Sequence, residues 1–135
     1  MKDLEEGSQL ALDFKKLKKV ASTGHDLLPV VVQHAESKEI LVVAYTNDLA
    51  FQHTLDTRIV TFWSSSRNEL WIKGKTSGDT LRLVEVRVNC EQNSLLYLAL
   101  PEQGGVCHTH DADGHTRPTC YYRRLLPDGA LEFID

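Results

Sequence analysis

Cysteine is scarce in this sequence: there are three among 135 residues, Cys90, Cys107 and Cys120, and none before residue 90. An odd number of cysteines cannot pair off completely as disulfides, so at least one thiol has no disulfide partner within the chain. Long apolar runs are also missing, since the longest, such as residues 27–32, are far too short to span a bilayer. No basic and then apolar leader opens the chain, so we expect a cytoplasmic, reducing location that leaves the thiols free.

Strong charge of either sign is absent as well. The net charge of −4 argues against general nucleic-acid binding. The region from Arg58 to Arg87 nevertheless holds six basic and three acidic residues, which suits a small anionic ligand such as a phosphorylated metabolite. A solvated surface of mixed charge is the alternative. Length and an apolar content of 41% predict one domain over residues 1–135, with a polar N-terminal extension at 1–26.

Short β-rich segments dominate the pattern. Strands are predicted at 29–33, 39–45, 59–64, 69–73, 81–90, 94–100 and 119–125. One clear helix is predicted at 47–55 with Asn47 as its N-cap, and Leu10, Phe14 and Leu17 recur at a spacing that allows a short helix in the extension. Turns are predicted at 36–38 and 127–129. Together these elements indicate an α+β fold with an antiparallel-rich sheet and few helices.

The three cysteines could converge on a metal. Three thiolates and an open position describe a catalytic zinc site, in which a bound water is activated. No Cys-x-x-Cys pair is present, so the fold or a second subunit would have to bring the ligands together. His108, beside Cys107, is placed for general acid/base catalysis or for closing the site as a fourth ligand. The alternative is that each cysteine is an ordinary buried residue.

Strand alternation sets two faces at the end of the segment 81–90, if the chain stays extended there. Cys90 would share a face with the valines at 84, 86 and 88, whereas Asn89, Glu91 and Asn93 would point the other way. Oxygen-bearing side chains suit magnesium, although only Glu91 of these three is a carboxylate. A turn between two strands is the alternative, because asparagine is common in turns.

Residues 63–78 combine tryptophans, serines, cations and glycines. Hydroxyls, backbone amides near glycine and a cationic side chain are what a phosphate needs, and tryptophan can stack on a purine ring. The candidate substrate-binding residues are Trp63, Ser64, Arg67, Trp71, Lys73 and Ser77. The alternative is a hairpin with tryptophans in the core and serines in the loop.

Five ordered motifs resemble those of the phosphoribosyl-AMP cyclohydrolase family, over about residues 27–125. They read Trp63-Ser64-Ser65-Ser66-Arg67, Leu70-Trp71-Ile72-Lys73-Gly74-Lys75-Thr76-Ser77-Gly78, Asn89-Cys90-Glu91-Gln92-Asn93, Cys107-His108-Thr109 and Thr119-Cys120-Tyr121-Tyr122-Arg123. A chance match to one motif is easy, whereas a match to all five in order is not.

The resemblance implies hydrolysis of the N1–C6 bond in the adenine ring of phosphoribosyl-AMP, the third step of histidine biosynthesis, giving the formimino-carboxamide ribonucleotide. It implies zinc held by Cys90, Cys107 and Cys120, drawn from two subunits of an intertwined homodimer. It also implies magnesium associated with residues 89, 91 and 93. His108 would move protons, and the cations and serines of residues 63–78 would hold the phosphate.

Some positions depart from the family pattern. Ser65 stands in place of an arginine, which removes one candidate phosphate contact. Asparagine, glutamate and asparagine at 89, 91 and 93 replace three aspartates, so the loss of negative charge should weaken Mg²⁺ binding. The loop Thr109–Pro118 is longer than usual and would alter the pocket wall.

Two other functions stay open at this point. One is a zinc hydrolase of a related purine nucleotide, which differs in the substrate that is turned over. The other is a zinc-stabilised, non-catalytic domain in which His108 is a fourth ligand. The coordination number separates the second, because a catalytic zinc must keep a position for water.

Overall fold

The computed structural model describes residues 2–134, in which three short helices accompany eight strands. The helices are α1 Lys2–Glu6, α2 Lys16–Ala21 and α3 Asp48–Thr57. The strands are β1 Leu28–His34, β2 Ile40–Thr46, β3 Thr61–Ser64, β4 Glu69–Ile72, β5 Leu81–Val88, β6 Leu95–Pro101, β7 Arg123–Leu125 and β8 Leu131–Phe133.

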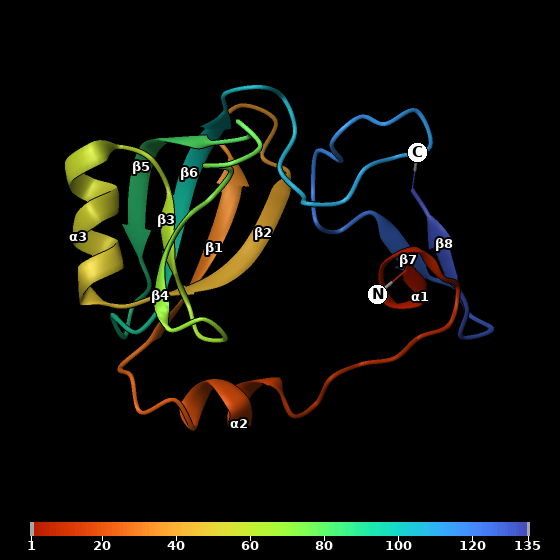
Figure 1. Cartoon of the computed structure of the whole chain (residues 1–135), viewed down its shortest axis with the longest axis horizontal. Helices are drawn as coiled ribbons and strands as arrows, with labels where there is room; N and C mark the ends of the chain where they lie inside the picture. Colours follow the sequence, from red (N-terminus) through yellow and green to blue (C-terminus); the bar gives the residue numbers. More distant parts are fainter. Residues whose placement is uncertain (1, 135) are drawn as a thin grey trace.

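A four-stranded sheet in the order β2-β1-β6-β5 forms the larger part of the molecule (Figure 1). β1 and β6 run parallel, whereas the two outer pairs are antiparallel. Burial alternates along β1 with a period of two: Val30 and Val32 are fully buried, and Val31 between them is not. The β3–β4 hairpin attaches to β5, because the Val60 N–H donates to the Leu81 carbonyl at 2.9 Å.

The main core involves the sheet and the β3–β4 hairpin, and α3 packs against β3. Asn47 caps α3, since its side-chain oxygen accepts a hydrogen bond from the Ala50 N–H at 2.9 Å. Arg58 ends the helix in the left-handed conformation, with φ at 62°. The buried core side chains are Val30, Val32, Leu41, Val42, Ala44, Val60, Phe62, Leu81, Leu83, Leu95, Tyr97, Ala99 and Val106.

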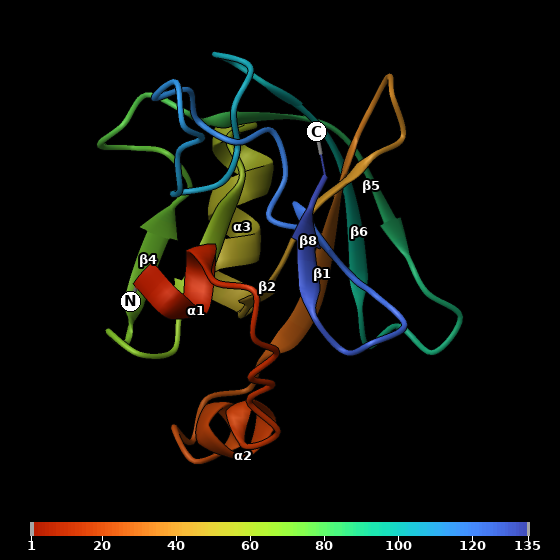
Figure 2. The same ribbon diagram turned by 90° about the vertical axis from the view of Figure 1, so that its right-hand side faces the viewer.

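Residues 103–134 and the helix α1 form a second cluster, the C-terminal lobe, which lies beside the sheet in Figure 1 and in front of it in Figure 2. The β7–β8 hairpin is its regular element. Arg123 donates to the carbonyls of Leu4 and Gly7, each at 2.8 Å, and the Leu131 N–H donates to the Ser8 carbonyl at 2.7 Å. Opposite ends of the chain are therefore joined in this lobe.

The α+β class, the antiparallel-rich sheet and the cap at Asn47 are confirmed. The strand expected at 119–125 is wrong in extent, because only Arg123–Leu125 pair, with a β8 strand that no pattern predicted. The expected extension helix covers Lys16–Ala21, so Leu17 is in it and Phe14 is not, and both side chains are exposed. The helix α1 was not predicted either; elements this short depend on tertiary contacts rather than on propensity.

The assignment of residues 1–135 to a single domain stays a prediction, and positions 1 and 135 lie outside the described part of the chain. Within residues 2–134, no helix is long and apolar enough to cross a membrane.

Candidate active site

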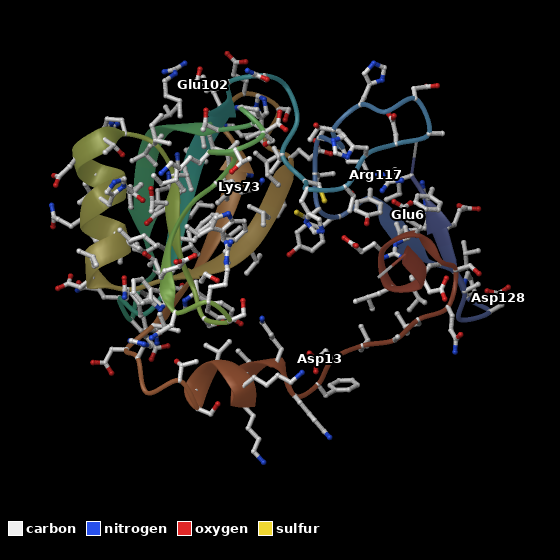
Figure 3. The ribbon with its side chains drawn as sticks, in the orientation of Figure 1. Glu6, Asp13, Lys73, Glu102, Arg117 and Asp128 are labelled. Atoms are coloured by element: carbon white, nitrogen blue, oxygen red, sulfur yellow. The ribbon has the colours of Figure 1, made fainter. Side chains whose placement is uncertain are left out.

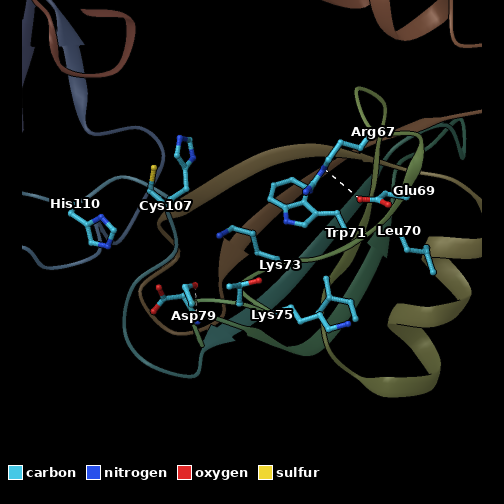
Figure 4. Close-up of a pocket in the computed structure, with 14 residues that line it drawn as sticks. Arg67, Glu69, Leu70, Trp71, Lys73, Lys75, Asp79, Cys107 and His110 are labelled. Carbon is cyan, nitrogen blue, oxygen red and sulfur yellow. Dashed lines mark hydrogen bonds and ion pairs between the residues drawn. The ribbon is translucent and has the colours of Figure 1, made fainter. Parts of the chain in front are cut away.

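A cavity of about 480 Å³ opens beside β4 and the loop that follows it (Figure 4). Arg67, Trp71 and Lys73, from the β3–β4 hairpin and the residue that follows it, line one wall. Cys107 and His108 of the C-terminal lobe line the facing wall. Cationic, aromatic and thiol side chains from distant parts of the sequence therefore meet at one hollow. Such a combination suits a ligand with both an anionic group and a flat ring.

Lys73 is the buried cation of this cavity, with 6% of its surface exposed. Its ammonium donates to the Val106 carbonyl and lies 6.0 Å from the centre of the Trp71 ring. Within the described part of the chain, no carboxylate lies within ion-pair distance of it. A buried cation that lines a cavity and has no carboxylate partner is stabilised when an anion binds there, so Lys73 is a candidate for anion binding.

Gly74 gives the loop after Lys73 its shape. Its φ is +79°, and a Cβ on it would fall 2.1 Å from the Asp79 carbonyl oxygen. Only glycine allows both the left-handed backbone and this close approach. The loop thereby turns back so that Asp79, which is also buried, lines the same cavity as Lys73.

Cys107 and Cys120 lie next to each other at the base of the C-terminal lobe, and both are free thiols. The Cys120 N–H donates to the Leu41 carbonyl at 2.8 Å, which fixes Cys120 at the start of β2. The pKa of Cys107 is lowered to about 5, chiefly because the Cys120 thiol hydrogen-bonds to it and also because the Thr109 hydroxyl donates to its Sγ at 3.1 Å. The same thiolate and burial raise the pKa of Cys120, which the charge of Lys73 partly opposes.

Cys90 lies elsewhere in this chain. The strand β5 ends at Val88, so Cys90 belongs to the turn that leads into β6 and does not continue the strand face. This turn follows the edge strand β5 at the start of β1, whereas Cys120 contacts the opposite edge, at the start of β2. The expectation that Cys90 shares a face with the valines of β5 is therefore wrong.

The physical reason is the side chain of Asn89. Its Oδ1 accepts hydrogen bonds from the N–H groups of Asn93 and Ser94, each at 2.9 Å, and its amide donates to the Asn93 Oδ1 at 2.7 Å. These bonds close the turn, with Gln92 at a φ of 56°. The opposed faces expected for residues 89–93 are absent, and Glu91 is exposed in the turn.

His108 lies at the mouth of the cavity, with 78% of its side chain exposed. Its Nε2 contacts a carboxylate oxygen of Glu5. The glutamate comes from α1, so the N-terminal extension reaches the candidate catalytic histidine. No sequence pattern predicted this contact, because the two residues are 103 positions apart.

The other predicted substrate-binding residues divide into two groups. Ser77 lines the cavity together with the three named above. Trp63 packs instead on His25, with ring centres 5.3 Å apart, and Ser64 accepts a hydrogen bond from the Arg67 N–H at 3.2 Å, which shapes the β3–β4 turn. Trp63 and Ser64 therefore do not line this cavity in the single chain.

The long loop between the last two cysteines forms part of the cavity wall. Its His110 lines the cavity, and its Thr116 hydroxyl donates to the Asp79 carboxylate at 3.1 Å. Asp79 was missed by the sequence analysis; its place directly after the glycine at 78 was the only signal.

The same loop holds a group of side chains that could bind a metal ion, Asp111, Asp113 and His115. Their ligand atoms lie within 4.8 Å of one another, and no other such group of three is found within residues 2–134. All three are exposed.

Comparison with known proteins identifies the family of the chain. The profile of phosphoribosyl-AMP cyclohydrolase matches residues 42–122. The phosphoribosyl-AMP cyclohydrolase of Hyphomonas neptunium is 42% identical over 107 residues, which cover 79% of this chain and 76% of the relative. That of Archaeoglobus fulgidus is 43% identical over 102 residues, which cover 76% of this chain and 88% of the relative.

A bifunctional relative shares the same region. The histidine biosynthesis bifunctional protein HisIE of Deinococcus radiodurans is 46% identical over 104 residues, which cover 77% of this chain but only 44% of that relative. The match to single-function relatives spans most of their length and most of this chain. The chain belongs to the phosphoribosyl-AMP cyclohydrolase family.

Proposed function

We propose that this protein opens the adenine ring of phosphoribosyl-AMP by hydrolysis of the N1–C6 bond, the third step of histidine biosynthesis. The observation that carries the proposal is the cavity in which Lys73, Arg67 and Trp71 face Cys107 and His108. Family membership supplies the substrate. The cavity supplies groups for the two kinds of chemical part in this substrate, a phosphorylated ribose and a purine ring.

The residues of the cavity divide the work by their chemistry. Trp71 offers an aromatic face for the purine, and it is held by Phe62, whose ring centre lies 5.5 Å away. Lys73 and Arg67 offer cations to the phosphate, and Ser77 offers a hydroxyl. His108 would take a proton from the attacking water and return it to the ring nitrogen that leaves.

Zinc would be held by Cys107 and Cys120 together with Cys90 of the partner subunit. Two adjacent thiols, one with a pKa lowered to about 5, are a soft donor pair that fits this metal. Within one chain Cys90 lies at the far edge of the sheet, which supports a homodimer with shared sites. When bound, zinc supplies Lewis-acid activation of water.

Magnesium would be held only weakly by Asn89, Glu91 and Asn93. The side chains of Asn89 and Asn93 already bond to each other, so a cation would have to compete with the turn that they close. Glu91 offers the one free charge of the set. We expect that activity of the zinc-loaded protein changes little when Mg²⁺ is removed by a chelator that spares zinc.

Ultraviolet absorbance of phosphoribosyl-AMP, followed with zinc-loaded protein, tests the function directly. We expect loss of the adenine chromophore that stops when a strong zinc chelator is added and returns when zinc is restored. Turnover of a different purine nucleotide would reassign the substrate. Stoichiometric zinc without any turnover would indicate a structural metal and would remove the proposed activity.

A further inference from the structure

The start of the N-terminal extension, residues 4–8, is hydrogen-bonded to the C-terminal lobe. The Tyr122 hydroxyl donates to the Glu5 carbonyl at 2.8 Å, and the Arg123 guanidinium and the Leu131 amide continue the contact toward Ser8. This segment lies outside residues 42–122, the part that matches the family profile. Its role is therefore not supplied by the match to the family profile.

Glu6 anchors the segment. Its carboxylate receives two hydrogen bonds from the Arg117 guanidinium, at 2.8 and 2.9 Å. The guanidinium lies 4.2 Å from the centre of the Tyr122 ring and 5.1 Å from that of Phe133, so both rings pack against it (Figure 3 labels Glu6 and Arg117). A bidentate, largely buried ion pair of this kind fixes α1 against the lobe.

Glu5, the neighbour of this anchor, contacts the Nε2 of His108. In the part of the chain that the structure describes, this is the one hydrogen bond that the His108 ring makes. The ring is otherwise exposed at the mouth of the cavity and would be free to turn about its side-chain bonds. An anchored carboxylate on one ring nitrogen limits that rotation and leaves Nδ1 as the nitrogen available to a ligand.

We propose that Glu5 is a positioning residue for His108, supplied by an N-terminal segment that the family match does not include. Glu5 holds the imidazole by Nε2, so that Nδ1 is presented to the bound substrate. This inference rests on the proposed function for its catalytic meaning. The underlying claim, that α1 orients the ring, stands on the contacts alone. Restricting a reacting group to one orientation raises the rate of the chemical step by a measurable factor.

The test compares Glu5→Ala with Asp3→Ala in the zinc-loaded, full-length protein. Asp3 lies on the same helix and carries the same charge, but its side chain is exposed and makes no hydrogen bond in the described residues. We expect Glu5→Ala to lower kcat roughly tenfold with KM unchanged, Asp3→Ala to leave both as they are, and Glu5→Gln to recover part of kcat because it keeps an oxygen in place.

The same substitution in a His108→Asn background separates positioning from folding. If Glu5 acts through His108, Glu5→Ala lowers the residual kcat of that variant no further. An equal loss in both backgrounds would overturn the inference. So would an unchanged kcat for Glu5→Ala, and a raised kcat would mean that α1 inhibits the site instead.

A readout independent of turnover is the ¹⁵N resonances of the His108 imidazole. We expect their chemical shifts to change in Glu5→Ala and to stay the same in Asp3→Ala. Unchanged chemical shifts in both variants would contradict the inference. Absence of turnover in the unmodified protein would refute the proposed function alone. The resonances would still decide whether Glu5 orients the ring.

Discussion

At the scale of single residues, the site is built from side chains whose charge is set by their neighbours. Cys107 is the clearest case, because a thiol, a hydroxyl and the charge of His108 all favour its ionised form. Lys73 is the counterpart, a buried ammonium that faces the same cavity. The cavity therefore contains a thiolate that can bind a metal ion and an ammonium group that can bind an anion.

The low pKa of Cys107 should be visible in the metal-free protein. We expect one thiolate to titrate near pH 5 when its ultraviolet absorbance is followed with pH. Cys120→Ala removes the donor that stabilises this thiolate, so the titration should move up toward the ordinary value. Cys107→Ala is the control, because it removes the thiol to which the low titration is assigned and should abolish that titration.

The same shift makes folding of the metal-free protein depend on pH. A pKa that falls on folding from 9.0 to about 5 contributes stability that is fully present above the unfolded value. That contribution is lost as pH falls through the folded value. Thermal melts between these two pH values should therefore show stability rising with pH, and a smaller rise in Cys120→Ala.

Lys73 should report on phosphate binding. Lys73→Met keeps the length of the side chain and removes the charge, so we expect KM for phosphoribosyl-AMP to rise about tenfold or more, the range for a lost charge-assisted hydrogen bond. Lys75→Met is the control, since Lys75 lines the same cavity but is exposed to screening solvent. An unchanged KM with normal circular dichroism would remove Lys73 from the phosphate site.

At the scale of elements, short loops between regular strands place the functional groups. The loop after β4 depends on Gly74, and the turn after β5 depends on Asn89. Asn89 shows how a local hydrogen bond can override strand alternation: it ends β5 two residues before the predicted boundary at 90. Fold class could be read from periodicity, but such boundaries depend on which side chain satisfies which backbone N–H.

Gly74→Ala tests the loop after β4. Both the positive φ and the close approach to the Asp79 backbone oppose a Cβ there, so we expect a loss of about 2 kcal/mol or more in the free energy of unfolding together with weakened substrate binding. Gly129→Ala is the matched control: its φ is +91°, yet nothing lies within 4 Å of the added Cβ. Strain alone should cost it about 1 kcal/mol. Equal losses would show that the close approach at Gly74 is unimportant.

At the scale of the whole molecule, the separation of the cysteines is the main observation. Cys107 and Cys120 meet at one edge of the sheet, and Cys90 follows the strand at the other edge. The C-terminal lobe also stands beside the sheet and is joined to it by a few segments (Figure 1). Both features support the proposed dimer, in which the turn that carries Cys90 in one subunit completes the zinc site of the other.

Mixed mutant subunits can test this sharing. Cys90→Ala and Cys107→Ala should each be inactive alone, because each lacks one ligand at every site. After unfolding and refolding together, half of the dimers carry one chain of each kind and one intact site, so about a quarter of the unmodified activity should return. Activity is measured by the same loss of adenine absorbance.

Cys107→Ala mixed with Cys120→Ala is the matched control. Both lost ligands then belong to the same side of the shared site, so every site stays defective and no activity should return. Recovery in this control, or none in the first mixture, would contradict a site shared in this way.

By itself the sequence determined the fold class, the family and the list of chemical groups. Periodicity of Val, Ile and Leu over single strands is a local property, as is the order of motifs from Trp63 to Arg123. Which of these groups meet was decided by tertiary structure alone. Cys120 is held beside Cys107 by the hydrogen bond that its backbone N–H donates to the Leu41 carbonyl of β2. Glu5 reaches His108 because the ion pair of Arg117 with Glu6 holds α1 against the lobe. Contacts between positions so far apart depend on how whole segments pack, and no local pattern encodes that packing.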